Sequence, residues 1–227
     1  AAYERALAFA QTLPASNAEF NRDAWASVGQ FGLFQPRPPI VPGGSADGAL
    51  NTAHVVEAFG RGTANAGLVF SACAHLFTAV MPIAAHGGDA LRERCLPLLR
   101  SGEWVGAGAM TEPTAGSDIY ALRTRAARVA DGYVLNGHKR YITNAPVADV
   151  LLVYASTEPS HGYLGLSAFV VERDRPGLRL SAAFDKAGLA GSPVGEVLLD
   201  DCFVPADNRV GAEGEGARIF QGAMQWE

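Results

Sequence analysis

The first hundred residues carry apolar side chains at the spacing of α-helices. In the second of five such stretches, Phe20, Ala24 and Val28 recur every four residues and would share one face of a helix. Ser16 and Glu19 precede them with the spacing of a capping box, which predicts where this helix begins. The pattern predicts helices over residues 2–13, 16–31, 48–60, 62–88 and 91–99.

The stretch over residues 62–88 contains no charged side chain when histidine is neutral. Its length would suffice to cross a membrane. Because Asn65, Ser71 and Pro82 interrupt the run, we interpret it instead as a central helix, buried on several sides of an all-α domain. His75 lies on this helix and is expected to be either a core histidine or a residue that lines a pocket.

Beyond residue 103 the apolar runs shorten, and turn residues return at the spacing of short strands. Asp131-Gly132 and Asn136-Gly137 mark two of these turns, and Asn-Gly in particular indicates a hairpin. Strands are predicted over residues 104–109, 133–135, 150–154, 166–171, 178–180 and 194–199. Helices followed by strands predict an α+β chain, in which an N-terminal all-α domain precedes an antiparallel β-barrel or sandwich domain.

We expect the helical domain to span residues 1–102 and the β domain to span residues 103–211. Glycines between positions 211 and 216 then predict a hinge rather than a phosphate loop, because no βαβ unit surrounds them. Residues 212–227 are expected to form the first turns of a C-terminal helical bundle that is otherwise absent.

Two stretches carry candidate chemistry. Residues 109–118 combine the end of a strand with Pro113, Gly116 and Ser117, a donor-rich loop that suits an anion or the edge of a polar ring. Further on, Tyr141 and Thr143 alternate along a strand and would share one face, where they could hold a flat heterocycle. Taken singly, an ordinary turn and a cross-strand pair on a sheet surface explain them equally well.

Composition favours an enzyme of a reducing compartment. The 227 residues are 48% hydrophobic, with a net charge of -5, which argues against nucleic-acid binding and against a basic membrane patch. Cys73, Cys95 and Cys202 are widely spaced, so neither disulfides nor a metal site are expected. The sequence does not open with a charged and then apolar leader, and a cytoplasmic location is therefore expected.

Together, the two stretches resemble the flavin-binding signatures of the acyl-CoA dehydrogenase family. The matching motifs are Thr-Glu-Pro-Thr-Ala-Gly-Ser-Asp over residues 111–118 and Lys-Arg-Tyr-Ile-Thr-Asn over residues 139–144. Residues 184–188, 191–192 and 197–205 extend the resemblance, which points to the isovaleryl-like or carrier-protein-linked branch. Ala190 departs from it, because many members of the family carry Arg there, and Gly108 stands where some have a larger residue.

The resemblance implies FAD as cofactor and gives roles to individual residues. Thr111 would meet the pyrimidine edge of the flavin, Tyr141 would pack on the ring, and Thr143 would bond near N5. The implied cofactor-binding residues are Met110, Thr111, Ser117, Tyr141, Ile142 and Thr143. Ser117 and His75 are the implied substrate contacts, whereas Glu112 is interpreted as a structural turn acid.

The implied reaction is FAD-dependent α,β-dehydrogenation of an acyl thioester carried by CoA or by a carrier protein. A carboxylate removes the α-proton while a hydride passes to flavin N5, and Glu227 matches the position of that base in one subgroup of the family. The alternative for Glu227 is an exposed surface residue. The resemblance also implies a homodimer or homotetramer that passes electrons to an electron-transfer flavoprotein or to oxygen. Two further alternatives are a flavin oxidase or monooxygenase, and a non-catalytic half-subunit that needs a partner chain.

Overall fold

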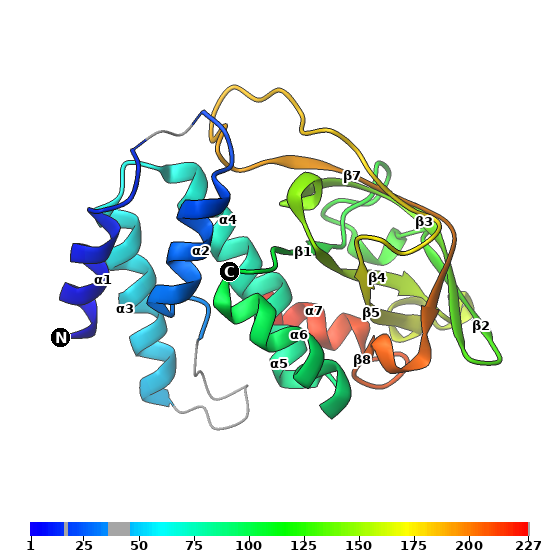
Figure 1. The fold of residues 1–227 in the computed structure, drawn as a ribbon. Coiled ribbons are helices and arrows are strands. Elements are labelled where there is room, and N and C mark those ends of the chain that lie inside the picture. Colours follow the sequence, from blue (N-terminus) through cyan, green and yellow to red (C-terminus); the bar gives the residue numbers. More distant parts are fainter. Residues whose placement is uncertain (16–17, 36–45, 227) are drawn as a thin grey trace.

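The computed structural model describes residues 1–15, 18–35 and 46–226. A helical half is followed by a β-sheet half, and a last helix, α7 (Gly216–Met224), lies where the two meet (Figure 1). The helices before the sheet are α1 (Ala2–Ala10), α2 (Arg22–Phe31), α3 (Ala46–Gly62), α4 (Ala66–His75), α5 (Met81–His86) and α6 (Asp89–Ser101). A π-helical turn, η1 (Leu76–Val80), joins α4 to α5.

Helix α2 begins later than its sequence pattern predicts. Its N-cap is Asn21, whose side-chain oxygen accepts a hydrogen bond from the Ala24 N–H at 2.9 Å. Asparagine satisfies the free N–H groups of a first turn as well as serine does, so the helix needs no earlier cap. The prediction of a start at Ser16 is therefore wrong, and Ser16 itself lies outside the described residues.

The predicted central helix is continuous from Ala66 to His86 and has the length and hydropathy of a membrane span. In this fold, however, 72% of its most apolar window is buried inside the protein. Packing against the other helices and the sheet therefore accounts for its lack of charge.

The β half is a mixed sheet whose strands follow the order β6-β7-β3-β2-β4-β5-β8, with β1 beside β4. The strands are β1 (Gly106–Ala109), β2 (Arg125–Val129), β3 (Gly132–Thr143), β4 (Val150–Ser156), β5 (Leu166–Glu172), β6 (Leu178–Leu180), β7 (Val194–Pro205) and β8 (Arg209–Val210). Most pairs are antiparallel, but β1 and β2 both run parallel to β4. The prediction of a wholly antiparallel domain is wrong there, because β1 enters the sheet from α6 and not from a hairpin.

Asn136 and Gly137 lie inside β3, so the predicted hairpin turn at this pair is also wrong. The chain reverses earlier, between β2 and β3. Asn136 instead marks a β-bulge, where the pairing of β3 with β7 shifts register. Its side-chain amide donates to Asp201 Oδ1 at 3.0 Å, and its Oδ1 accepts from the Asp201 N–H at 2.9 Å. These bonds fix the bulge.

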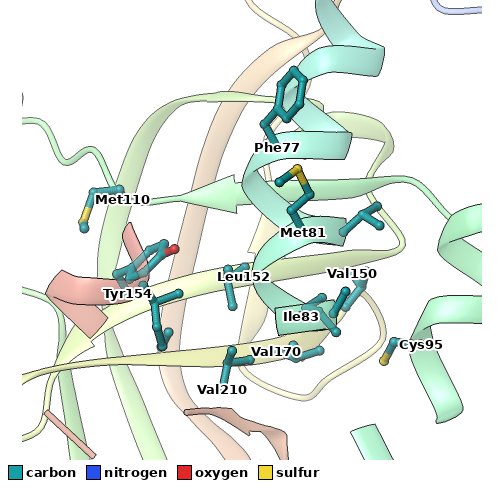
Figure 2. Packing of buried hydrophobic residues seen from close by; sticks show 14 of the residues in the cluster. Phe77, Met81, Ile83, Cys95, Met110, Val150, Leu152, Tyr154, Val170 and Val210 are labelled. Atoms are coloured by element: carbon teal, nitrogen blue, oxygen red, sulfur yellow. The ribbon is translucent and has the colours of Figure 1, made fainter. Parts of the chain in front are cut away.

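The helical and sheet halves share one hydrophobic core. Met81 and Ile83 from the central helix pack with Leu152 and Val170 of the sheet (Figure 2). Ile219 of α7 belongs to the same cluster. Each fully buried aliphatic side chain of this kind stabilises the fold by roughly 1.5–3 kcal/mol. The junction between the halves is therefore a firmly packed support for a site.

Candidate functional site

A cavity of about 190 Å³ lies at the junction between the two halves. Helix α4, the turn η1, strands β1, β3 and β4 and helix α7 all contribute to its wall. The lining residues are Ala74, Thr78, Gly108, Met110, Thr111, Tyr141, Ile142, Thr143, Tyr154, Phe220, Ala223 and Met224. The fold thus brings together five residues for which the sequence predicts a cofactor role, namely Met110, Thr111, Tyr141, Ile142 and Thr143.

Tyr141 is aimed at this cavity by an irregularity in β3. Its φ is 60°, in the left-handed region, and the pairing with β7 shifts register between Lys139 and Ile142. Bulges re-aim side chains in this way, and strained backbone concentrates at functional sites. The Tyr141 side chain is 61% exposed. The guanidinium carbon of Arg140 lies 5.1 Å from its ring centroid, and the ring of Phe184 lies 5.8 Å away.

The loop that follows β1 is fixed by a buried ion pair. Lys139 Nζ lies 2.9 Å from Glu112 Oε1, and the two side chains are 0% and 4% exposed. The same Nζ donates to the Met110 carbonyl oxygen at 3.0 Å. The Arg140 N–H donates to the carbonyl oxygen of Thr111 at 2.9 Å. Strand β3 therefore holds both carbonyls of the cavity-lining pair Met110–Thr111.

Glu112 has a structural role, in line with its interpretation as a turn acid. Its carboxylate accepts hydrogen bonds from the Arg123 N–H at 2.6 Å, from the Thr124 N–H at 2.9 Å, and from the Thr124 hydroxyl. Burial acts to raise the pKa of Glu112, but the Lys139 ammonium and these hydrogen bonds hold it below its ordinary value. Burial in turn lowers the pKa of Lys139 to about 8. At neutral pH both groups are therefore charged.

The N–H of Thr111 has no acceptor in the part of the chain that the structure describes. The described residues contain no cis peptide bond, and a trans peptide directs its N–H and its carbonyl in opposite directions. Because the Met110 carbonyl points to Lys139, the Thr111 N–H points away from the ion pair. A residue of the cavity wall thus carries a free donor, which a ligand with an accepting edge would satisfy.

The π-helical turn η1 places Thr78 in the cavity wall. Its hydroxyl donates to the Ala74 carbonyl oxygen at 2.6 Å. Strand β1 passes so closely that a Cβ on Gly108 would lie 2.6 Å from the Thr78 Cβ. Thr78 therefore occupies the space that a larger residue at position 108 would need. π-Helical turns are often found at functional sites.

His75 lies in the core and does not line the cavity. It is fully buried and packs against the rings of Trp25 and Phe34, whose centroids lie 5.0 and 4.4 Å from its own. The Gly106 N–H donates to His75 Nδ1 at 2.8 Å, and Nε2 lies 3.1 Å from the Leu99 carbonyl oxygen. Both ring nitrogens are therefore engaged within the protein, which is the arrangement of a core histidine, and the substrate contact stays a prediction.

Ser117 and Glu227 are not among the cavity-lining residues. Ser117 is exposed on the loop between β1 and β2. Glu227 lies outside the described residues. Helix α7, which precedes it, buries Ile219 and Ala223 against the core.

Sequence reasoning missed Thr78, Tyr154 and the side chains of α7 as lining residues, and it gave Lys139 no role. The available signal for Thr78 was a hydroxyl three residues after His75 in an otherwise apolar run. For Lys139 the signal was a cation within an alternating strand, two residues before Tyr141. Within the described residues, no three His, Cys, Asp or Glu side chains are grouped so that they could hold a metal ion.

The class of fold is defined by two domains, one helical and one a mixed sheet, which share one donor-lined cavity. Residues 2–103 match the family profile described as "Acyl-CoA dehydrogenase, N-terminal domain", and residues 107–202 match "Acyl-CoA dehydrogenase, middle domain". The chain belongs to the acyl-CoA dehydrogenase family.

Curated relatives include members of both branches that the sequence motifs suggest. The L-prolyl-[peptidyl-carrier protein] dehydrogenase of Pseudomonas fluorescens is 47% identical over 209 residues, which are 92% of this chain and 55% of the relative. The mitochondrial isovaleryl-CoA dehydrogenase of Pongo abelii is 38% identical over 221 residues, 96% of this chain and 52% of the relative. The chain therefore spans about half the length of the curated relatives it matches.

Solved structures also match nearly the whole chain. A structure described as PigA with FAD and proline superposes with a TM-score of 0.92 at 40% identity, covering 99% of this chain and 61% of that one. The prolyl acyl carrier protein oxidase AnaB superposes with a TM-score of 0.92 at 39% identity, again over 99% of this chain and 61% of the other.

Proposed function

We propose that the chain forms the flavin-binding and acyl-binding part of an FAD-dependent enzyme that dehydrogenates an acyl thioester at its α and β carbons. The observation that carries this proposal is the convergence of Thr111, Tyr141 and Thr143 on one cavity at the domain junction. The likeness to PigA, described with FAD and proline, supports it.

The residues of the cavity fit an isoalloxazine ring. Tyr141 offers an exposed aromatic face for stacking, and Thr111 offers an N–H for which the described residues contain no acceptor. Met110, Ile142 and Thr143 also line the cavity. Ser117, outside the cavity, would contact the phosphates of the cofactor or the pantetheine arm of the substrate. FAD supplies the hydride-accepting chemistry when bound, and these residues hold and orient it.

Helix α7 provides an apolar place for the acyl group. Phe220, Ala223 and Met224 line the cavity together with Tyr154, on elements other than the donor-bearing loop. A second and more apolar cavity of about 380 Å³, between α3, α4 and Leu189, shares Ala74 with the first. Apolar walls exclude water, which strengthens the electrostatic interactions of any charged group inside.

We propose Glu227 as the base that removes the α-proton. In the sequence, Glu227 follows Phe220 and Ala223 at positions i+7 and i+4, which is the spacing of one helix face. Both of those residues line the cavity. A carboxylate in apolar surroundings has a raised pKa, which suits it to take a weakly acidic proton. The charge that then develops on the thioester oxygen needs fixed hydrogen-bond donors.

The thioester carrier is proposed to be a carrier protein or CoA. The L-prolyl-[peptidyl-carrier protein] dehydrogenase of Pseudomonas fluorescens is 47% identical, against 42% for the cyclohex-1-ene-1-carbonyl-CoA dehydrogenase of Syntrophus aciditrophicus and 38% for the isovaleryl-CoA enzyme of Pongo abelii, which favours a small acyl group on a carrier protein. We further propose a cytoplasmic homodimer or homotetramer, with electron-transfer flavoprotein or oxygen as the acceptor. AnaB is described as an oxidase, which supports oxygen as a specific candidate for the electron acceptor.

Anaerobic reduction of bound FAD tests the proposal. The protein is reconstituted with FAD and mixed with prolyl-carrier protein or isovaleryl-CoA while the visible absorbance of the oxidised flavin is followed. Bleaching by either thioester is expected, and a protein that binds no FAD would refute the assignment. Glu227→Gln should bind FAD normally and bleach at least about a hundredfold more slowly, as expected for a lost general base. An unchanged rate would exclude Glu227.

Two alternatives give distinct results in the same experiment. Rapid reoxidation by oxygen in the presence of product identifies an oxidase. A half-subunit that needs a partner chain would show FAD binding only after that partner is added. This second alternative is supported by apolar side chains that are exposed on the surface, namely Tyr163, Leu164 and Met224.

A further inference from the structure

The peptide group between Met110 and Thr111 has a cation at one end and a free donor at the other. The Lys139 ammonium donates to the Met110 carbonyl oxygen at 3.0 Å from a side chain with 0% exposure. The other end of the same peptide is the Thr111 N–H, which no described residue accepts. Thr111 itself lines the cavity.

A cation that donates to the carbonyl oxygen polarises the peptide group and makes the N–H of that peptide a better donor. Hydrogen bonds in series polarise one another, and bonds that involve an ionised group are roughly twice as strong as neutral ones. Water screens this effect little, because Lys139 and Glu112 are both buried. Glu112 keeps the ammonium in place and is itself fixed by the N–H groups of Arg123 and Thr124.

We propose that Lys139 is a positioning residue that acts through the Met110–Thr111 peptide, turning the Thr111 N–H into a strengthened and fixed donor for the flavin edge that gains negative charge on reduction. The inference rests on the proposed function, because it needs a flavin ring in the cavity. It predicts that the cation favours the binding of reduced FAD over oxidised FAD. A Lys139–Glu112 ion pair that only holds the loop in place would support the binding of oxidised and reduced FAD equally.

Lys139→Met tests this, because it removes the charge and keeps an unbranched side chain. Since that change leaves the Glu112 carboxylate buried without its partner, Lys139→Met/Glu112→Gln is measured beside it. Lys186→Met is the matched control. Lys186 is the other lysine of the sequence, and its ammonium also donates to backbone carbonyls, at 2.9 Å to Leu189 and 2.6 Å to Ser192, but it does not line the cavity.

The readouts are the affinity for oxidised FAD, by fluorescence titration, and the midpoint potential of bound FAD, by equilibration with a redox dye. Both Lys139 variants should lose about tenfold in their preference for reduced FAD, which corresponds to a fall of about 30 mV for a two-electron couple. Lys186→Met should keep the wild-type potential. Circular dichroism shows whether Lys139→Met is folded. If this single variant unfolds, the potential of the double variant tests the inference.

An unchanged potential in a folded double variant would overturn the inference, even if both forms of FAD bound more weakly. That result would leave the proposed function standing, because wild-type protein would still bind FAD and bleach with thioester. A wild-type protein without affinity for FAD would instead overturn the proposed function, and this inference with it.

Discussion

Acidification should destabilise this fold through one buried histidine. A neutral His75 ring with its proton on Nε2 satisfies both partners, because Nδ1 accepts from the Gly106 N–H and Nε2 faces the Leu99 carbonyl. A second ring proton would find no acceptor at Nδ1 and would place a charge where there is no water. Burial accordingly lowers the pKa of His75 from 6.5 to about 3.

The sign and size of the effect follow from these two values. Because the folded pKa lies below the unfolded one, the unfolded chain binds this proton more tightly between pH 6.5 and pH 3. The free energy of unfolding is therefore unaffected by His75 above pH 6.5 and falls below it, by about 1.4 kcal/mol per pH unit. Between pH 7 and pH 5, His75 alone should remove about 2 kcal/mol, a sizeable share of typical domain stability.

Urea unfolding at pH 7, 6 and 5 measures this loss, with tryptophan fluorescence as the signal, since the Trp25 ring lies 5.0 Å from His75. The comparison is with His75→Gln, whose neutral amide offers one donor and one acceptor. Carboxylates and His86 titrate in both proteins, so the difference between the two pH profiles isolates His75. Parallel profiles would refute the reasoning and would mean that His75 takes up its proton in the folded state, as a pocket residue would.

Three further substitutions probe the cavity wall and the sheet. Tyr141→Ala should weaken FAD binding about tenfold by fluorescence titration, through loss of a stacking face, whereas Tyr141→Phe should bind as the wild type does. Gly108→Ala should lower the free energy of unfolding by roughly 1–3 kcal/mol, because its Cβ would press on η1, while Gly188→Ala, whose Cβ meets nothing within 4 Å, should be neutral in the same thermal melt. Asn136→Ala should cost about 1 kcal/mol by denaturant unfolding, since it removes both bonds to Asp201. Equal melting of the two glycine variants, or an unchanged Tyr141→Ala affinity, would contradict these expectations.

Local sequence patterns were sufficient to predict much of the fold and part of the site. Helical spacing and strand-length runs predict the helices and most strands, and the two motifs that contain Thr111, Tyr141 and Thr143 predict residues that line one cavity. The elements depend on residues close in sequence, where side-chain direction follows from the element itself. Tyr141 is an exception, because the irregularity of β3 at this residue directs its side chain. The roles of these residues toward FAD remain predictions.

What the sequence could not predict are the features that depend on contacts between segments far apart in the chain. Asn136-Gly137 has the composition of a hairpin turn, yet pairing with β7 continues β3 through it and turns it into a bulge. The sequence leaves His75 as either a core or a pocket-lining histidine, and only the fold places Gly106 and Leu99 against its two nitrogens. Lys139 and Glu112 are far apart in sequence, so nothing local shows that they pair.

The parallel pairing of β1 with β4 has a consequence for how the chain comes to be folded during synthesis. Strand β1 leaves the helical half, but its partner β4 is completed only at Ser156. Until the ribosome has released that segment, the central helix lacks the sheet that covers its apolar side, and Met81 and Ile83 have no partner in Leu152. The helical half should therefore emerge as a loosely packed intermediate that chaperones can bind, and it becomes fully ordered only when the sheet forms against it.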